Sequence, residues 1–403
     1  MTASTRAGTQ TGPADPGSRS VALDAARGTA ILGILIVNVG YMRGPQPLLG
    51  EATGALPALV AVFAEQKFIT LFAFLFGFGL ALQASRARER DLTPTPRALR
   101  RLAVLAVFGI AHIVLLWPGD VLLFYAFLGV LLLPFLERSA RTMLVWAGAL
   151  LAAGTTLFLA AAGLVVLAEQ VAGVDAAASG ARDLALFAGQ AEAVYTTGTA
   201  GEVFAFRVRE YLTIMLPGYA FAFPQLLAMA LLGAAWWTLD GQAALRADPD
   251  RLRPLLRWGY GLGLPLNLIA GLLVAGDPLG LTALGVFGYA LLTPAAPLLA
   301  LAYAASIARL AQRRPSAWIV SALAAVGRTA LSNYLLQSLL TSVVFVWFGW
   351  YGEVGVGGTV LLVLAVWTVN LLVSPWWLRR FRYGPVEWLW RAATDGTRPR
   401  WRQ

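Results

Sequence analysis

His112 and Asp120 are the side chains of this chain best suited to proton-transfer chemistry. The single histidine of the sequence lies in the apolar stretch GIAHIVLLWPGD, and Asp120 follows it by eight residues. A neutral imidazole beside a carboxylate in a dry site can act as a general base at neutral pH. A lone histidine on an apolar helix is more often a packing residue, but burial in a membrane makes that reading more costly. We therefore expect His112 to be a catalytic base that Asp120 orients, with packing as the alternative.

Three polar residues of the first apolar segment are candidates for substrate binding. Asp24 and Arg27 are three residues apart, so they share a helix face and can pair. Asn38 follows Arg27 by about three helical turns and returns close to the same face. The alternative is that the charged residues lie at the membrane surface and that Asn38 only packs. The sharper interpretation is a polar track that crosses the membrane on one helix.

Lys67 is the only lysine of the chain, and it lies well inside the second apolar segment. This depth exceeds what a lysine side chain easily spans to reach the surface. An ion pair with Glu65 or Asp120 and a contact with a ligand are equally compatible with the sequence.

A fourth polar face lies in the stretch GRTALSNYLLQSLLTS. Thr329, Asn333, Gln337 and Thr341 recur every four residues, and Arg328 lies at the start. This spacing places amides and hydroxyls on one helix face. The face either forms a hydrogen-bonded seam between helices or lines a substrate cavity.

The composition predicts how these residues are positioned. Of the 403 residues, 58% are hydrophobic and only 13% are charged, and apolar runs of roughly 18 residues or more recur along the chain. We therefore predict an all-α, polytopic membrane protein. The absence of cysteine excludes disulfides and thiolate chemistry, and one histidine disfavours a conventional zinc site, so we expect no metal. The net charge of +10 is scattered through short connections and does not indicate nucleic-acid binding.

We predict ten membrane-spanning segments with both termini in the cytoplasm. Basic connections alternate with acidic ones, and all the basic connections then fall on the side that the positive-inside rule makes cytoplasmic. Arg207 and Arg209 lie on the opposite side, either as an interfacial exception or as contacts for an acidic group. The predicted segments are 20–41, 57–82, 98–116, 120–136, 141–168, 210–239, 255–275, 281–308, 319–349 and 357–378.

The chain divides into a disordered cytoplasmic leader (1–18), a transmembrane domain (19–382) and an amphipathic cytoplasmic tail (383–403). The longest predicted connection, about 169–203, is acidic and lies on the outer side. No internal repeat is apparent, and the oligomeric state stays open.

Five stretches in order resemble the YeiB-like family of bacterial membrane proteins, a domain of unknown function. The resemblance covers nearly the whole chain from Arg19 to Arg391. It implies a multi-pass protein of the bacterial plasma membrane. The stretches are LDAARGTAILGILIVN, KFITLFAFLFGFGLALQ, GIAHIVLLWPGDVLLFYAFLG, GRTALSNYLLQS and RYGPVEWLWR.

The family is distantly similar to a transmembrane acyltransferase superfamily that includes heparan-α-glucosaminide N-acetyltransferase. This similarity implies transfer of an acyl group from cytoplasmic acyl-CoA, such as acetyl-CoA, to an acceptor of the cell envelope. Arg27 matches the arginine of the first-helix motif, and Asn38 matches the asparagine of the glucosaminide enzyme. That enzyme has its catalytic histidine just after the first helix, where this chain has Gly40-Tyr41-Met42-Arg43. Either His112 has taken over the base role, or the chain is not an acyltransferase of that kind.

An acyltransferase would use the residues named above in three places. Cationic groups would bind the phosphates of CoA, polar faces would line a thioester tunnel, and His112 with Asp120 would accept a proton. The cationic candidates are Arg27, Arg100, Arg101 and Arg328, and the tunnel candidates are Asn38, Asn333 and Gln337. The rival interpretation is a transporter or lipid exporter, because Pro217-Gly218, Pro224 and Gly261 to Pro265 interrupt two neighbouring apolar segments. We expect no tightly bound cofactor. The expected partners are the bilayer, the acyl donor and the acceptor, and an oligomer is also possible.

Overall fold

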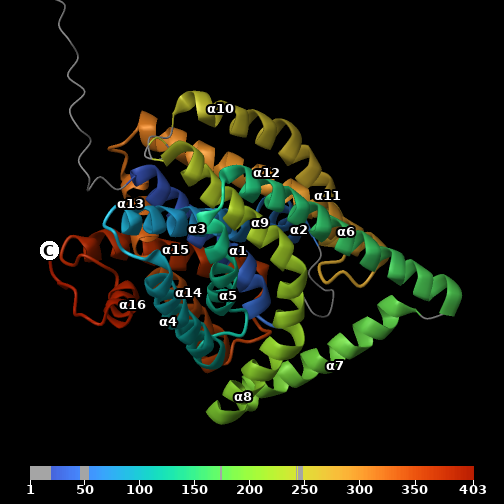
Figure 1. Ribbon diagram of the computed structural model, residues 1–403. Helices are drawn as coiled ribbons and strands as arrows, with labels where there is room; N and C mark the ends of the chain where they lie inside the picture. Colours follow the sequence, from blue (N-terminus) through green and yellow to red (C-terminus); the bar gives the residue numbers. More distant parts are fainter. Residues whose placement is uncertain (1–19, 46–53, 173–174, 242, 244–247) are drawn as a thin grey trace, which may run out of the picture.

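The computed structural model describes residues 20–45, 54–172, 175–241, 243 and 248–403, and within them every regular element is helical. Figure 1 shows the arrangement of these helices. The α-helices in chain order are α1 (Val21–Met42), α2 (Ala55–Phe63), α3 (Lys67–Arg88), α4 (Pro94–Leu115), α5 (Leu122–Leu132), α6 (Ala140–Ala172), α7 (Ala176–Thr197), α8 (Ala200–Glu210), α9 (Leu216–Asp240), α10 (Pro249–Trp258), α11 (Leu264–Gly276), α12 (Ala283–Arg313), α13 (Trp318–Arg328), α14 (Ala330–Ser342), α15 (Val356–Leu378) and α16 (Pro385–Asp395). The shorter elements are the 3-10 helix η1 (Leu133–Glu137) and the π-helical turns η2 (Tyr211–Met215), η4 (Gly259–Gly263) and η5 (Val343–Trp347).

The prediction of an all-α polytopic membrane protein is confirmed. Nine helical stretches of the described chain are long and apolar enough to cross a bilayer. The predicted segment 120–136 corresponds to α5 with η1, which is a shorter apolar stretch. The predicted leader, 1–18, lies outside the described residues.

Two segments that the sequence predicts as continuous are interrupted helices. The predicted segment 57–82 breaks between α2 and α3, where Gln66 adopts a left-handed φ of 61°. The predicted segment 319–349 breaks at Thr329, between α13 and α14. Each break exposes backbone groups at the helix ends, and side chains supply partners for some of them.

The long acidic connection predicted at 169–203 is a helix for most of its length. Side-chain caps explain this difference. Asp175 accepts a hydrogen bond from the amide of Ala178 at the start of α7, and Thr199 forms a reciprocal capping box with Glu202 at the start of α8. In Figure 1 the far end of α6 and the helix α7 extend away from the main bundle, and α7 leads back to α8.

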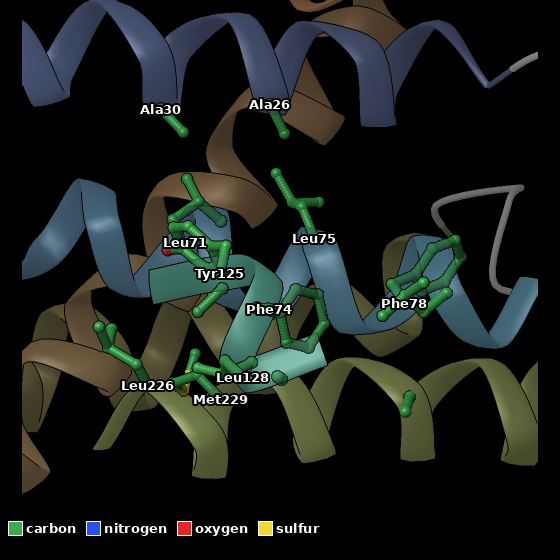
Figure 2. Packing of buried hydrophobic residues seen from close by; sticks show 14 of the residues in the cluster. Ala26, Ala30, Leu71, Phe74, Leu75, Phe78, Tyr125, Leu128, Leu226 and Met229 are labelled. Carbon is green, nitrogen blue, oxygen red and sulfur yellow. The ribbon is translucent and has the colours of Figure 1, made fainter. Parts of the chain in front are cut away.

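The main core lies where α1, α3, α5 and α9 meet, as Figure 2 shows for Ala30, Leu71, Phe74, Tyr125 and Met229. Helices α3 and α9 approach closely because Gly77 has no side chain. A Cβ atom there would lie 1.9 Å from the carbonyl oxygen of Ala230. This core fixes the helices that carry the polar residues described next.

The tail helix α16 packs beside α4 and against the start of α14 (Figure 1). The indole of Trp390 donates to the carbonyl oxygen of Arg101 over 2.8 Å. The carboxylate of Glu387 accepts hydrogen bonds from the amides of Leu331 and Ser332, which are unpaired amides of the first turn of α14. A side chain of the tail therefore caps the helix that carries Asn333 and Gln337.

Candidate active site

His112 and Asp120 lie in contact inside the protein, as their spacing predicts. Nδ1 of His112 is 2.9 Å from Oδ2 of Asp120, and both side chains are fully buried. The contact is close but not in line for a hydrogen bond. The second carboxylate oxygen, Oδ1, accepts from the amide of Leu123 over 2.7 Å, which anchors Asp120 at the start of α5. A single tight turn from Trp117 to Asp120 thus brings the carboxylate back beside the last turn of α4.

Ser338 completes a buried triad that the sequence alone did not predict. Its Oγ lies 2.8 Å from Nε2 of His112, and Ser338 itself is buried. With the ring proton on Nδ1, facing the carboxylate, Nε2 accepts the hydroxyl proton of Ser338. We call His112, Asp120 and Ser338 the buried triad. Its members can move a proton from a hydroxyl to an imidazole that a carboxylate stabilises.

Gly109 makes the close approach of α4 and α5 at the triad sterically feasible. A Cβ atom at this position would lie 2.4 Å from the amide nitrogen of Leu123 and 2.7 Å from Oδ1 of Asp120. Only a residue without a side chain leaves room there for the carboxylate. The glycine is one helical turn before His112, so the same face of α4 carries the base and admits its partner.

Arg207 lies buried on the far side of the triad. Its guanidinium donates to the carbonyl oxygen of Leu115, at the end of α4, and to Oγ of Ser342, one turn beyond Ser338, each over 2.7 Å. These contacts satisfy a free carbonyl at the end of α4 and join α8 to α4 and α14. Its position on the side opposite to the basic connections therefore has a structural explanation. Arg209 lies 5.8 Å from the ring of Phe187.

A cavity of about 800 Å³ reaches from the basic end of the bundle toward the triad. Among the described residues, ten arginines and three carboxylates line it, and we call these arginines the arginine mouth. They are Arg27, Arg86, Arg88, Arg90, Arg97, Arg100, Arg101, Arg328, Arg382 and Arg391. Most come from the ends of α3 and α4 and from the tail, which the chain folds onto one side.

The inner part of the cavity is apolar and ends at Tyr334. Along α1 the lining runs from Asp24 to Ile34, a rise of about 15 Å at 1.5 Å per residue. The ring of Tyr334 lies 5.0 Å from the ring of His112, and its hydroxyl lies 3.4 Å from both Val121 N and Gly119 O. Tyr334 therefore separates the cavity from the buried triad.

Several contacts organise the arginine mouth. Arg27 pairs with Asp24 over 3.0 Å, as their spacing predicts. The guanidinium of Arg101 stacks 3.9 Å from the ring centroid of Trp390. Outside the helical spans, burial raises the pKa of Glu387 despite the hydrogen bonds from Ser332 and the α14 amides that oppose this rise.

The predicted tunnel residues Asn38, Asn333 and Gln337 are not among the residues that line this cavity. Asn333 faces α15 instead, where its side-chain nitrogen donates to Oγ of Ser374 over 2.9 Å. The contact of Asn333 with Ser374 is that of the hydrogen-bonded seam between helices, one of the two alternatives that the spacing allows. Gln337 is buried with no acceptor for Nε2, and Asn38 is half-buried on α1. Periodicity defines a face but not the neighbour that it meets.

Lys67 lies fully buried at the break between α2 and α3. Its ammonium donates to the carbonyl oxygen of Ala61 over 2.8 Å. That carbonyl belongs to the last turn of α2, where carbonyls have no amide partner and the helix dipole favours a cation. Among the described residues Lys67 forms this cap and no ion pair with Glu65 or Asp120, and it does not line the cavity. The alternative of a ligand contact stays a prediction.

Two curated bacterial proteins are similar to this chain over almost its whole length, and a family model matches its C-terminal part. The family described as "Protein of unknown function (DUF418)" matches residues 241–397. "Uncharacterized protein YxaH" of Bacillus subtilis is 31% identical over 92% of this chain and 93% of its own length. "Uncharacterized protein YeiB" of Escherichia coli is 30% identical over 93% of this chain and 96% of its own length. No solved structure matches the chain. The chain belongs to the YeiB-like (DUF418) family of membrane proteins, whose function is unknown.

Proposed function

We propose that this protein is a transmembrane acyltransferase that takes an acyl group from acyl-CoA and passes it to a hydroxyl or amine acceptor. The observation that carries the proposal is one cavity that joins the arginine mouth to the wall of the buried triad. Acyl-CoA has anionic phosphates at one end and an apolar, reactive thioester at the other. The phosphates match the arginine mouth, and the thioester matches the apolar inner part of the cavity.

The arginine mouth suits the phosphates of CoA. Guanidinium groups bind phosphate oxygens through paired hydrogen bonds and keep their charge at all physiological pH values. Arg101 is the best-positioned member, because its side chain stacks on Trp390 and its backbone carbonyl is bonded to the same indole. Arg27, Arg100 and Arg328 line the cavity from α1, α4 and α13.

The inner cavity suits the pantetheine arm and the thioester. Its apolar walls include Ile31 and Ile34 of α1 and Leu105 of α4, with Tyr125 of α5. Small-molecule pockets of this kind combine apolar walls with a few polar groups that fix orientation. The hydroxyl of Tyr334, held only by contacts of 3.4 Å, is a donor available to a thioester carbonyl.

His112 supplies the proton acceptor for the transfer. As the acceptor hydroxyl or amine attacks, Nε2 takes its proton, and Asp120 stabilises the imidazolium that forms. The positive-inside rule assigns the arginine mouth to the cytoplasm, where acyl-CoA is made. The acceptor then reaches the triad from the outer half of the bilayer or from the cell envelope. We place the protein in the bacterial plasma membrane.

Binding of acetyl-CoA to the purified protein tests this function. We expect saturable binding to wild type, a clear loss of affinity in Arg27→Ala and Arg101→Ala, and none in Arg257→Ala, an exposed arginine outside the cavity. We also expect CoA release to require His112. A folded wild-type protein that binds no acyl-CoA would contradict the proposal and would favour the transporter interpretation.

A further inference from the structure

We infer that Ser338 is a nucleophile and that the acyl group passes through a covalent ester on its Oγ. This inference rests on the proposed function and deepens it: transfer occurs in two displacements, with the acyl-serine between them. The buried triad is the observation that carries it.

A serine, a histidine and a carboxylate follow one another here at close range, although the Nδ1–Oδ2 contact is not in line for a hydrogen bond. Oγ of Ser338 lies 2.8 Å from Nε2 of His112, whose Nδ1 lies 2.9 Å from Oδ2 of Asp120. The second oxygen of Asp120 is held by the amide of Leu123. Such a constellation is recognised by geometry and roles and not by the order of its residues in the chain.

The Ser338 hydroxyl contacts a side chain of another helix, as those of Ser332 and Ser374 also do. Hydroxyls within helices commonly bond to the carbonyl four residues earlier. Thr29, Thr155 and Thr341 do so here, over 3.0, 2.9 and 2.8 Å. Ser338 points its hydroxyl across the helix interface to the histidine of α4. The contact of this buried serine is therefore with the imidazole of His112 and not with a carbonyl of its own helix.

Tyr334 controls access to this serine. It is one helical turn before Ser338 on the same face of α14, and it ends the cavity. Its hydroxyl contacts are long, so rotation of the side chain costs little hydrogen bonding. A path from the cavity to Oγ of Ser338 requires this rotation. The phenol can then donate to the oxyanion that forms on the acyl carbon. The π-helical turn η5 follows α14 directly, and such turns are frequent at functional sites.

Both displacements balance with the residues present. In the first, Oγ bonds to the thioester carbon while Nε2 of His112 takes the hydroxyl proton. The C–S bond breaks, and the thiolate leaves as CoA thiol with the proton from the imidazolium. In the second, the acceptor oxygen or nitrogen attacks the ester carbon and gives its proton to Nε2. The ester C–O bond then breaks, and Ser338 recovers the proton.

The test measures thiol release from acetyl-CoA in the absence of any acceptor. The chain contains no cysteine, so a thiol reagent reacts only with the CoA that is released. A double displacement predicts a burst of about one CoA per chain and a matching acetyl group on Ser338 by peptide mass spectrometry. Ser338→Ala and His112→Ala should lose the burst. Ser374→Ala, which truncates another buried serine away from the cavity, should retain it.

A second probe separates this inference from the proposed function. An alkyl fluorophosphonate labels an activated serine without any acyl donor. Labelling of Ser338 that His112→Ala abolishes would support the nucleophile even if acetyl-CoA failed to bind. A contrary result is also defined. Folded wild-type protein would bind acetyl-CoA and release CoA only when an acceptor is present, and Ser338 would carry no label. This result would overturn the inference and leave the acyltransferase proposal standing. Absence of both label and burst would also overturn it.

Discussion

Two contacts of nearly equal length between a basic and an acidic side chain lie near opposite ends of the cavity. Arg97 and Asp395, at the arginine mouth, are 2.8 Å apart with side chains 52% and 24% exposed, whereas His112 and Asp120 are 2.9 Å apart and fully buried. An exposed pair contributes about 0–1 kcal/mol, because water and salt screen it. A buried pair must repay its desolvation, and removing one partner costs roughly 3–5 kcal/mol. The contact at the mouth therefore adds little to stability, whereas loss of either partner of the buried contact leaves a desolvated polar group at a high cost.

Neutralising the carboxylate of the triad should have the largest effect on activity. In Asp120→Asn, an amide replaces the group that stabilises the imidazolium of His112. Acyl transfer should fall roughly 10²–10⁴-fold, with acetyl-CoA affinity unchanged because the mouth is intact. Initial rates of CoA release with acceptor present measure the loss. Equal activity in wild type and variant would show that the buried pair is only a packing contact.

Filling the space beside the triad should have the second-largest effect. Gly109→Ala places a methyl group against Leu123 N and Asp120 Oδ1, and overpacking of this kind costs about 1–3 kcal/mol. We expect a lower melting temperature together with reduced turnover. Gly148→Ala, on a helix face with no atom near the new Cβ, is the matched control and should melt at or slightly above the wild-type temperature. A Gly109→Ala protein as stable and active as wild type would contradict the tight approach of α4 and α5.

Removing a cation from the mouth should have a moderate effect. Arg101→Ala deletes a charged hydrogen-bond donor of about 1.5–3 kcal/mol, so the dissociation constant for acetyl-CoA should rise roughly 10-fold or more. The effect should shrink as salt is added, because the mouth is open to solvent. Titrations at low and high ionic strength check both statements. A change in turnover at saturating acetyl-CoA, without a change in affinity, would argue against a binding role.

The exposed pair at the mouth should contribute least. The hydrogen bond from Arg97 lowers the pKa of Asp395 below its usual 3.8. A lowered carboxyl pKa stabilises the folded state above the unfolded pKa, and this stabilisation is lost as the pH falls through the lower folded value. Asp395→Asn should therefore cost at most about 1 kcal/mol near pH 7, and the difference should vanish in strong acid. Melting curves across this pH range test the sign.

The sequence predicts the fold class and one half of the site, because both depend on local patterns. Apolar runs identify the helices, and the short turn Trp117-Pro118-Gly119-Asp120 places the carboxylate beside His112. Ser338 escapes prediction because it lies 226 residues from His112 and only the packing of α4 against α14 joins them. A serine four residues after a cavity-facing tyrosine carries no local signal of its own.

The errors share a physical cause: a residue's own helix does not reveal its neighbours. The spacing of Asn333 fits a cavity wall and an interhelical seam equally well, and the contact with Ser374 decides between them. The local sequence does not predict the break at Thr329. The amides of Leu331 and Ser332, which follow the break, bond to Glu387, more than fifty residues away. The sequence leaves Lys67 open between an ion pair and a ligand contact, and the structure shows that it caps α2.

The most direct test of the central claim is a cryo-EM structure of the protein bound to a thioether analogue of acetyl-CoA, which cannot react. We expect density for the phosphates among the arginines of the mouth and density for the acyl carbonyl beside Tyr334, next to the buried triad. Density elsewhere, or an empty cavity at a saturating concentration of the analogue, would contradict it.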